Sequence, residues 1–187
     1  MKKHLFLLSL AAVIGLSGCG KNTTGEKNED VSNEPQQEDM EMDMNHSGSG
    51  EVPATLKVAE NPTYPVGSEA IIETDHMPGM KGAVATIVGA YDTTAYAITY
   101  TPVTGGEKVT NHKWVIQEEM KDAGDRTLEP GAEVTVEADH MKGMEGAEAV
   151  IDLAEDTTVY MIDYTPTSGG EAVTNHKWVT ESELSAK

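Results

Sequence analysis

Hydrophobic and polar residues alternate along four short stretches, at residues 70–74, 83–88, 95–101 and 112–117. In the third stretch, for example, Tyr96, Ile98 and Tyr100 fall on one side of the alternation. A period of two is typical of a strand that buries one face. The period of a helix is almost absent, apart from single turns at 117–120 and 181–184. The pattern predicts an all-β protein of short strands.

The four stretches recur 64 residues further along the chain, which is the spacing from His76 to His140. The block TNHKWV at 110–115, for instance, recurs unchanged at 174–179. Aligned copies also identify the exposed face, because a position such as Val84 that becomes Glu148 must face solvent. We therefore expect two tandem repeat units at 55–120 and 121–187, each folded as a small SH3-like barrel.

The chain begins with a segment typical of secreted proteins. Two lysines precede an apolar run at 5–16 that is too short to remain a membrane-spanning helix, so residues 1–18 are a predicted signal peptide. Leu-Ser-Gly-Cys follows and resembles the lipobox of bacterial lipoproteins, in which the cysteine carries the lipid. Cys19 is the predicted lipidation site, and an ordinary signal peptide with an incidental cysteine is the alternative.

A polar segment separates Cys19 from the repeats. Residues 19–54 are rich in Glu, Asp, Asn, Gln, Ser and Gly, so they are expected to form a flexible, disordered tether. The net charge of −19 argues against nucleic acid and anionic lipid surfaces as partners and favours attraction of cations. Because Cys19 is the only cysteine, neither a disulfide nor a thiolate metal site is expected.

Two loops carry an unusual set of side chains. DHMPGM at 75–80 and DHMKGM at 139–144 lie where the first strand of each repeat meets the second. Imidazole with thioether sulfur suits copper, with Cu(I) favoured over Cu(II), whereas calcium and magnesium prefer oxygen and zinc seldom takes thioether. The alternative is that the methionines fill the core and the histidines bond a turn. The candidate ligands are His76, Met77, Met80, His140, Met141 and Met144.

The tether repeats this chemistry in MEMDMNH at 40–46. No predicted fold surrounds these residues, so core packing does not explain the methionines. Met40, Met42, Met44 and His46 are therefore further candidate copper ligands.

The NHKW motifs leave two interpretations open. His112 and His176 either complete a site with the loop of their own repeat or are polar edge residues beside a buried ring. Trp114 and Trp178 are expected in the core.

The phrases DHMxGMxGA, TTVYMIDYT and TNHKWV, within residues 60–185, resemble the YdhK family of Gram-positive lipoproteins, which includes CopL-like copper-binding surface proteins. The resemblance implies a lipid-anchored, copper-binding protein on the extracellular face of the cytoplasmic membrane of a Gram-positive bacterium, supporting copper tolerance. The resemblance does not identify the copper ligands, and it leaves open whether a copper exporter or an oxidase is a partner.

These observations favour a protein that sequesters or buffers copper without catalysing a reaction. No nucleophile–base motif or phosphate loop indicates an enzyme. The sequence does not distinguish a copper buffer from a copper chaperone, because both need the same ligands. The alternative function is a cell-wall or surface binding module, because SH3-like domains can bind peptides through an aromatic groove.

Overall fold

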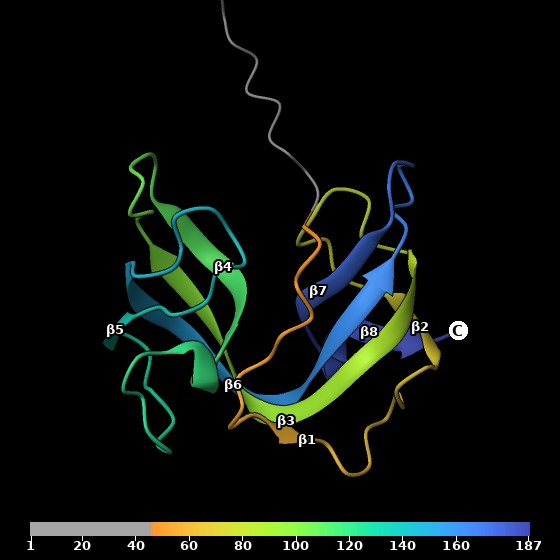
Figure 1. Ribbon diagram of the computed structural model, residues 1–187, viewed down its shortest axis with the longest axis horizontal. Helices are drawn as coiled ribbons and strands as arrows, with labels where there is room; N and C mark the ends of the chain where they lie inside the picture. The colour runs from red at the N-terminus through yellow and green to blue at the C-terminus, as the bar shows by residue number, and fades with distance from the viewer. Residues whose placement is uncertain (1–45) are drawn as a thin grey trace, which may run out of the picture. The chain divides into compact units, whose positions relative to one another are not determined.

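The structure is a computed structural model that describes residues 46–187, all of which belong to one compact unit. Within these residues the strands join into one 8-stranded sheet, shown in Figure 1. The strands are β1 (Lys57–Val58), β2 (Glu69–Ile72), β3 (Val84–Tyr100), β4 (Val109–Ile116), β5 (Glu133–Thr135), β6 (Glu148–Tyr164), β7 (Val173–Thr180) and β8 (Leu184–Ala186). Two 3-10 turns, η1 (Gln117–Glu119) and η2 (Glu181–Glu183), follow β4 and β7. The all-β prediction and the tandem repeat are confirmed.

The long strands β3 and β6 form the centre of the sheet. They pair antiparallel from Ala85 opposite Tyr164 to Tyr100 opposite Ala149. The alternation had suggested separate strands at 83–88 and 95–101, whereas the structure has one 17-residue strand, β3. The residues between those stretches contain no turn, and pairs such as Thr93 with Thr157 satisfy their backbone groups on β6.

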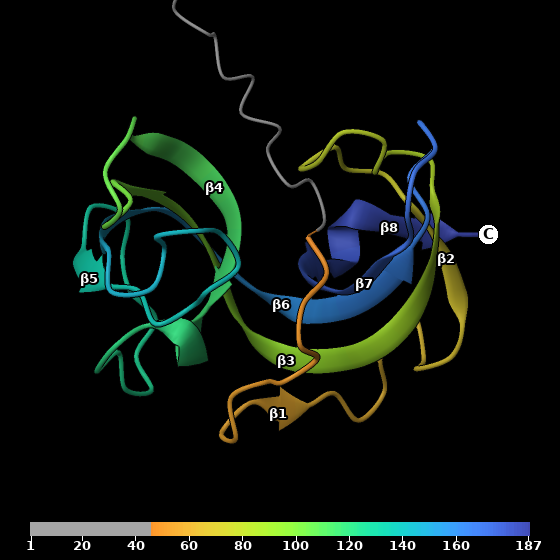
Figure 2. The same cartoon turned by 45° about the horizontal axis from the view of Figure 1, so that its top comes forward.

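Two hydrophobic cores lie at opposite ends of this ladder, and we call the parts around them lobe 1 and lobe 2. Lobe 1 combines β2 and the first half of β3 with the second half of β6, β7 and β8. Lobe 2 combines the second half of β3 and β4 with β5 and the first half of β6. The two lobes and the long strands that pass from one to the other are visible in Figures 1 and 2.

Each core therefore draws on both repeats. In lobe 1, Ile72 and Ile87 of the first repeat pack in one cluster with Tyr160 and Ile162 of the second. In lobe 2 the contributions are reversed. The units at 55–120 and 121–187 describe the sequence repeat, but they are not the packing units. Because β3 and β6 each continue from one lobe into the other, the first part of each repeat packs in one lobe and the rest packs in the other.

A third cluster fills the space between the lobes. Trp114 of β4 and Trp178 of β7 are 2% and 0% exposed, and they pack with Ala95, Ile116 and Val159. The predicted core position of both tryptophans is correct. Ala95 belongs to this cluster, and Tyr96, the next residue of β3, belongs to the core of lobe 2. Because neighbouring residues of a strand face opposite sides of the sheet, the cluster lies on the face opposite the lobe cores and joins the two lobes there.

Residues 46–54 were expected to belong to the flexible tether, but they run along β7. The backbone N–H of Gly48 donates to the carbonyl oxygen of Thr174 at 2.9 Å, and Lys177 Nζ donates to the carbonyl oxygen of Glu51 at 2.9 Å. Residues 1–45 lie outside the described part of the chain. Within the described part, no helix is both long and apolar enough to cross a membrane.

The exchanged cores make a direct prediction about fragments. Residues 46–120 and 121–187, produced separately, should each fail to form a folded monomer, because each fragment holds half of both cores. Mixed at equal concentrations, they should assemble into a 1:1 complex with native-like tryptophan fluorescence. Light scattering and circular dichroism would check this, and a cooperatively folded monomer of either fragment would contradict it.

Candidate functional site

The two His-Met loops have the same conformation in both lobes. Gly79 and Gly143 adopt positive φ angles of 78° and 79°, which glycine accepts without steric cost. Each loop rests on the turn after the long strand of the other repeat: Thr167 N–H donates to the Gly79 carbonyl at 2.8 Å, and Val103 N–H to the Gly143 carbonyl at 2.9 Å. The exchanged strands therefore also position the loops.

The two methionines of each loop have different environments. Met80 and Met144 are both 0% exposed and belong to the two hydrophobic cores. The expectation that they face outward as copper ligands is therefore replaced by a packing role, which the apolar alternative had described. Met77 and Met141 are partly exposed and pack at the edge of the same cores. Only these two loop sulfurs are accessible to an ion.

Each loop histidine binds a glutamate at the end of the lobe. His76 Nε2 lies 2.8 Å from Glu183 Oε1, and Trp114 Nε1 donates to Glu183 Oε2 at 2.8 Å. Because Trp114 lies on β4 in lobe 2 while Glu183 and His76 lie in lobe 1, this three-residue arrangement crosses between the lobes. We call it a His–Glu–Trp relay.

A second relay repeats the first with the lobes exchanged. His140 Nε2 lies 2.8 Å from Glu119 Oε1, and Trp178 Nε1 donates to Glu119 Oε2 at 3.1 Å. The backbone N–H of Ile116 also donates to Glu119 Oε2, at 3.2 Å. The two relays are therefore internal symmetry mates, each built from both repeats.

The two relay glutamates are ionised at neutral pH. Burial by itself would raise the pKa of Glu119, but the charge of His140 and the hydrogen bond from its ring outweigh burial and lower that pKa. The pKa of Glu183 is lowered in the same way, against burial, by the hydrogen bond and charge of His76. A carboxylate only accepts hydrogen bonds, so each imidazole must donate from Nε2.

When the imidazole is neutral, donation from Nε2 leaves the other ring nitrogen of each loop histidine as an acceptor. Nδ1 of His76 and Nδ1 of His140 are buried, and neither has a hydrogen-bond partner. A buried polar atom without a partner costs about 1–3 kcal/mol. An imidazole held on a carboxylate through one nitrogen, with a lone pair on the other, is the arrangement in which histidines bind metals.

Sequence reasoning had missed Glu119 and Glu183. The signal was present, because these residues are separated by the repeat spacing while their neighbours Glu118 and Ser182 differ. The pattern did not say which carboxylate would reach which imidazole. Chain exchange brings each glutamate to the histidine of the other repeat.

His176 on β7 is buried and His112 on β4 is half-buried, and both are neutral imidazoles at pH 7. Burial lowers the pKa of His112 to about 4, with a further contribution from the charge of His140. Burial lowers the pKa of His176 to about 3, with a further contribution from His76. The ring of His112 contacts Tyr100 in the lobe 2 core, and the ring of His176 contacts Tyr164 in the lobe 1 core. Each strand histidine therefore lies in the lobe that holds the loop of the other repeat rather than its own.

The charge of His46 also lowers the pKa of both His112 and His176. Even so, within residues 46–187 no group of three or more His, Cys, Asp or Glu side chains is arranged to hold a metal ion. Cys19, Met40, Met42 and Met44 lie outside the described residues.

The family assignment follows from comparison with known proteins. A family model described as "Protein of unknown function (DUF1541)" matches residues 66–117 and 130–181, once in each repeat. The chain belongs to the DUF1541 family. It is 58% identical over 186 residues to the "Uncharacterized protein YdhK" of Bacillus subtilis strain 168, covering 100% of this chain and 90% of that protein. The resemblance to the YdhK family is thereby confirmed.

Solved structures of DUF1541 proteins share this fold. The crystal structure of a DUF1541 family protein, ydhK of Bacillus subtilis, is 66% identical with a TM-score of 0.75, and the match covers 78% of this chain and 99% of that chain. The solution structure of the ydhK C-terminal domain is 69% identical with a TM-score of 0.63, over 66% of this chain and 93% of that chain.

The buried histidines predict how the stability of the metal-free protein depends on pH. His112 and His176 have folded-state pKa values below the ordinary value of 6.5, so the unfolded chain binds more protons between 6.5 and those values. Their contribution to the free energy of unfolding is complete above pH 6.5 and is lost as the pH falls toward their folded-state pKa values. The loss should be on the order of 2 kcal/mol per histidine between pH 7 and pH 4.5.

Urea unfolding of the metal-free protein between pH 4.5 and 8 would measure this dependence. The double variant His112→Phe/His176→Phe should have a shallower acid slope, and its profile above pH 7 should parallel that of the wild type. An unchanged slope in the variant would contradict the assignment.

Proposed function

We propose that this protein is an extracytoplasmic, lipid-anchored, copper-binding protein that sequesters or buffers copper, with Cu(I) favoured, and so supports copper tolerance. The observation that carries the proposal is the buried Nδ1 without a partner in each of two symmetric relays. Each of these imidazoles is already held by a carboxylate through Nε2, which leaves the second nitrogen to bind a ligand.

The surrounding donors support a soft ion. Met77 and Met141 directly follow the two relay histidines, and their thioether sulfurs are compatible with Cu(I) rather than with hard cations. The strand histidines are neutral at pH 7, so no proton competes for their lone pairs. His76, Met77 and His176 supply the donors in lobe 1, and His140, Met141 and His112 supply them in lobe 2.

The N-terminal part of the chain supports a position outside the cytoplasm. A signal peptide at 1–18 and Cys19 as lipid attachment site would anchor the protein to the extracellular face of the cytoplasmic membrane, and the relative from Bacillus subtilis supports a Gram-positive source. Met40, Met42 and Met44 add sulfur donors between the anchor and the folded part. The net charge of −19 draws cations toward both.

The competing functions have less support. A wall-binding module needs aromatic rings along an open groove, but Trp114 and Trp178 are buried between the lobes. A buffer needs no catalytic group, and each ionised carboxylate of the relays already serves a histidine. Sequestration therefore accounts for the relays and requires neither an open aromatic groove nor a catalytic group.

Copper titration with matched variants tests the proposal. His76→Gln/His140→Gln should lose the copper bound by the folded part, because glutamine can still donate to each carboxylate but offers no nitrogen in place of Nδ1. Met77→Leu/Met141→Leu should weaken binding by about ten-fold or more. Met80→Leu/Met144→Leu is the control, since those sulfurs lie in the cores and their replacement should leave the stoichiometry unchanged.

Competition with a chromophoric Cu(I) chelator would measure these affinities, on chains that lack residues 19–45 so that the tether does not contribute. Identical stoichiometry and affinity in all three variants would refute the proposal for the folded part.

The relay carboxylates should tune the metal site. Glu119→Gln/Glu183→Gln replaces two ionised acceptors with neutral amides, so each imidazole is held less strongly in the tautomer that leaves Nδ1 unprotonated. Copper affinity should fall by about 10–100-fold, and the rise in melting temperature caused by copper should shrink accordingly. Thermal unfolding with and without Cu(I) would check this, and an equal copper-induced rise in both proteins would contradict it.

A further inference from the structure

One edge of β7 in lobe 1 is covered by the residues that precede the repeats, 46–51, which we call the edge segment. In addition to the bonds described above, Thr174 N–H donates to Ser47 Oγ at 3.0 Å, and Asn175 Nδ2 donates to the Gly48 carbonyl at 3.3 Å. A Cβ at Gly48 would meet the carbonyl oxygen of Asn175 at 2.6 Å. The edge segment is therefore fitted closely to β7, and its fit requires a glycine.

The residues of β7 that hold the edge segment recur unchanged in β4. The matching pairs are Thr174 with Thr110, Asn175 with Asn111, and Lys177 with Lys113. The backbone is the same as well, because both asparagines have a positive φ of 52°. The register of β4 on β3 also matches that of β7 on β6. Lobe 2 therefore presents the same three side chains on the same backbone.

In lobe 2 this edge is open within the described residues 46–187. There, β4 pairs with β3 alone. Asn111 N–H donates to Thr99 Oγ1 of β3 at 3.2 Å, and Lys113 Nζ lies 4.9 Å from the ring centre of Trp114 on its own strand. No described element other than β3 hydrogen-bonds to the three edge residues of β4.

The exposure of the two edges differs in the expected direction. Asn111 is exposed where Asn175 is half-buried, and His112 is half-buried where His176 is buried. The repeat cannot supply a second edge segment, because the residues 64 positions after the first, 110–115, lie within β4 itself. The same surface is thus covered in one lobe and open in the other.

The covered edge indicates what the open edge binds. Two edges with the same donors and the same backbone accept the same kind of ligand, an extended chain with a glycine opposite the asparagine and a carbonyl within reach of the lysine. The edge segment meets these requirements with Ser-Gly-Ser-Gly, a sequence that occurs once in the chain.

The occupant of the open edge is expected to be a different protein. In a second copy of this chain the Ser-Gly-Ser-Gly sequence is already bound to its own β7. Intramolecular binding is favoured by a high effective concentration, so a second copy would have to release this segment before it could dock.

We infer that the open edge of β4 is a docking site for an extended, serine- and glycine-rich segment of a partner protein, which binds β4 as residues 46–51 bind β7. The inference goes beyond the proposed function and does not depend on copper. It assigns an interaction surface to the lobe that the edge segment leaves uncovered.

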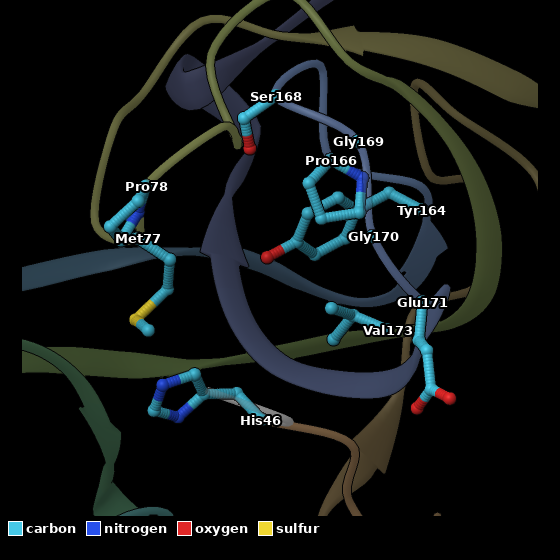
Figure 3. A pocket seen from close by; sticks show the side chains of 10 residues that line it. All are labelled: His46, Met77, Pro78, Tyr164, Pro166, Ser168, Gly169, Gly170, Glu171 and Val173. Atoms are coloured by element: carbon cyan, nitrogen blue, oxygen red, sulfur yellow. The ribbon is translucent and has the colours of Figure 1, made fainter. Parts of the chain in front are cut away.

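The edge segment also shows how far a docked segment reaches. His46 at its beginning lines a cavity of about 330 Å³ in lobe 1 together with Met77 and Val173 (Figure 3). The residue that matches Met77 in lobe 2 is Met141. A segment docked on β4 should therefore extend to the loop at 139–144, where the methyl group of Met141 can report its arrival.

A synthetic peptide of residues 46–52, HSGSGEV, with blocked ends is the probe. The mature chain, residues 19–187 with Cys19→Ser, is labelled with ¹⁵N and with ¹³C at the methionine methyl groups and titrated with the peptide in the absence of metal. Because the contact consists of a few hydrogen bonds, binding to one site with a Kd on the order of 1 mM or below is expected.

The resonances that move identify the site. Docking on β4 should shift the amide resonances of Asn111 and Lys113 and the methyl resonance of Met141. Their counterparts in lobe 1, such as Asn175 and Met77, should stay in place because the edge segment already covers β7.

Variants of the peptide test the fit. Gly48→Ala in the peptide should weaken binding by about ten-fold or more, because its Cβ would displace the peptide from β4 and break its hydrogen bonds. Ser49→Ala is the matched control and should bind as the original does. Ser49 is exposed, and its hydroxyl accepts only a local bond from Glu51 N–H at 3.2 Å.

Variants of the protein test the donors. Asn111→Asp keeps a residue that tolerates positive φ but removes the Nδ2 donor, so it should weaken peptide binding by about three- to ten-fold. Lys113→Ala should weaken binding by a similar factor. Lys121→Ala is its control, because it removes the same charge from an exposed position of lobe 2 outside β4.

The outcomes are distinct. If the peptide shifts no resonance of β4, or if the peptide with Gly48→Ala binds as tightly as the original, the inference is overturned. If the resonance of Asn111 shifts with protein concentration in the absence of peptide, the occupant is a second copy, and the assignment to a different protein is wrong. Because no metal is present, none of these results bears on the proposed function.

Discussion

The ladder between β3 and β6 is the constraint on which the rest of the structure depends. It runs from Ala85 to Tyr100 on one strand and from Ala149 to Tyr164 on the other, with two register shifts along the way. Each strand is longer than one small core requires, so its two halves face two different cores. Because the backbone hydrogen bonds of this ladder keep both strands extended, the elements that follow the long strand of a repeat lie in the other lobe from the elements that precede it. The relays, the loop contacts and the shared tryptophan cluster all follow from that exchange.

The relays are costly to bury, and the exchange explains how they are satisfied. Glu119 is buried and Glu183 half-buried, and each carboxylate accepts bonds from an imidazole, from an indole of the other lobe and from a backbone N–H. A buried charge without such partners would strongly destabilise the fold. Satisfying the carboxylate uses one nitrogen of each imidazole and leaves the other without a partner. The proposed ligand-binding role therefore falls on the same two side chains that satisfy the carboxylates.

The internal symmetry is close in the sheet and broken at its N-terminal edge. The relay, the loop and the strand histidine each occur in two copies, whereas the segment 46–51, which hydrogen-bonds to β7, precedes the repeats. A protein made of two equal repeats thus gains a distinct first lobe from a few residues that precede them.

Much of the fold was readable in the chain itself. Alternation placed Tyr96, Ile98 and Tyr100 on a buried face, the 64-residue spacing from His76 to His140 revealed the repeat, and TNHKWV indicated core tryptophans. These features are local or compare one copy with the other, so no tertiary information is needed to see them. The donor types, imidazole and thioether, were equally visible.

Tertiary structure alone decided which donors face which space. Met77 and Met80 are three residues apart in one loop, yet Met80 is fully buried in the lobe 1 core while Met77 is partly exposed at the edge of that core. Glu183 reaches His76 across more than a hundred residues of chain, and only strand exchange brings them within 2.8 Å. The sequence by itself determined the repeated strands and the chemistry of the loops. Pairing along the whole length of β3 and β6 determined the partners, because backbone hydrogen bonding between distant strands leaves no mark in a local pattern.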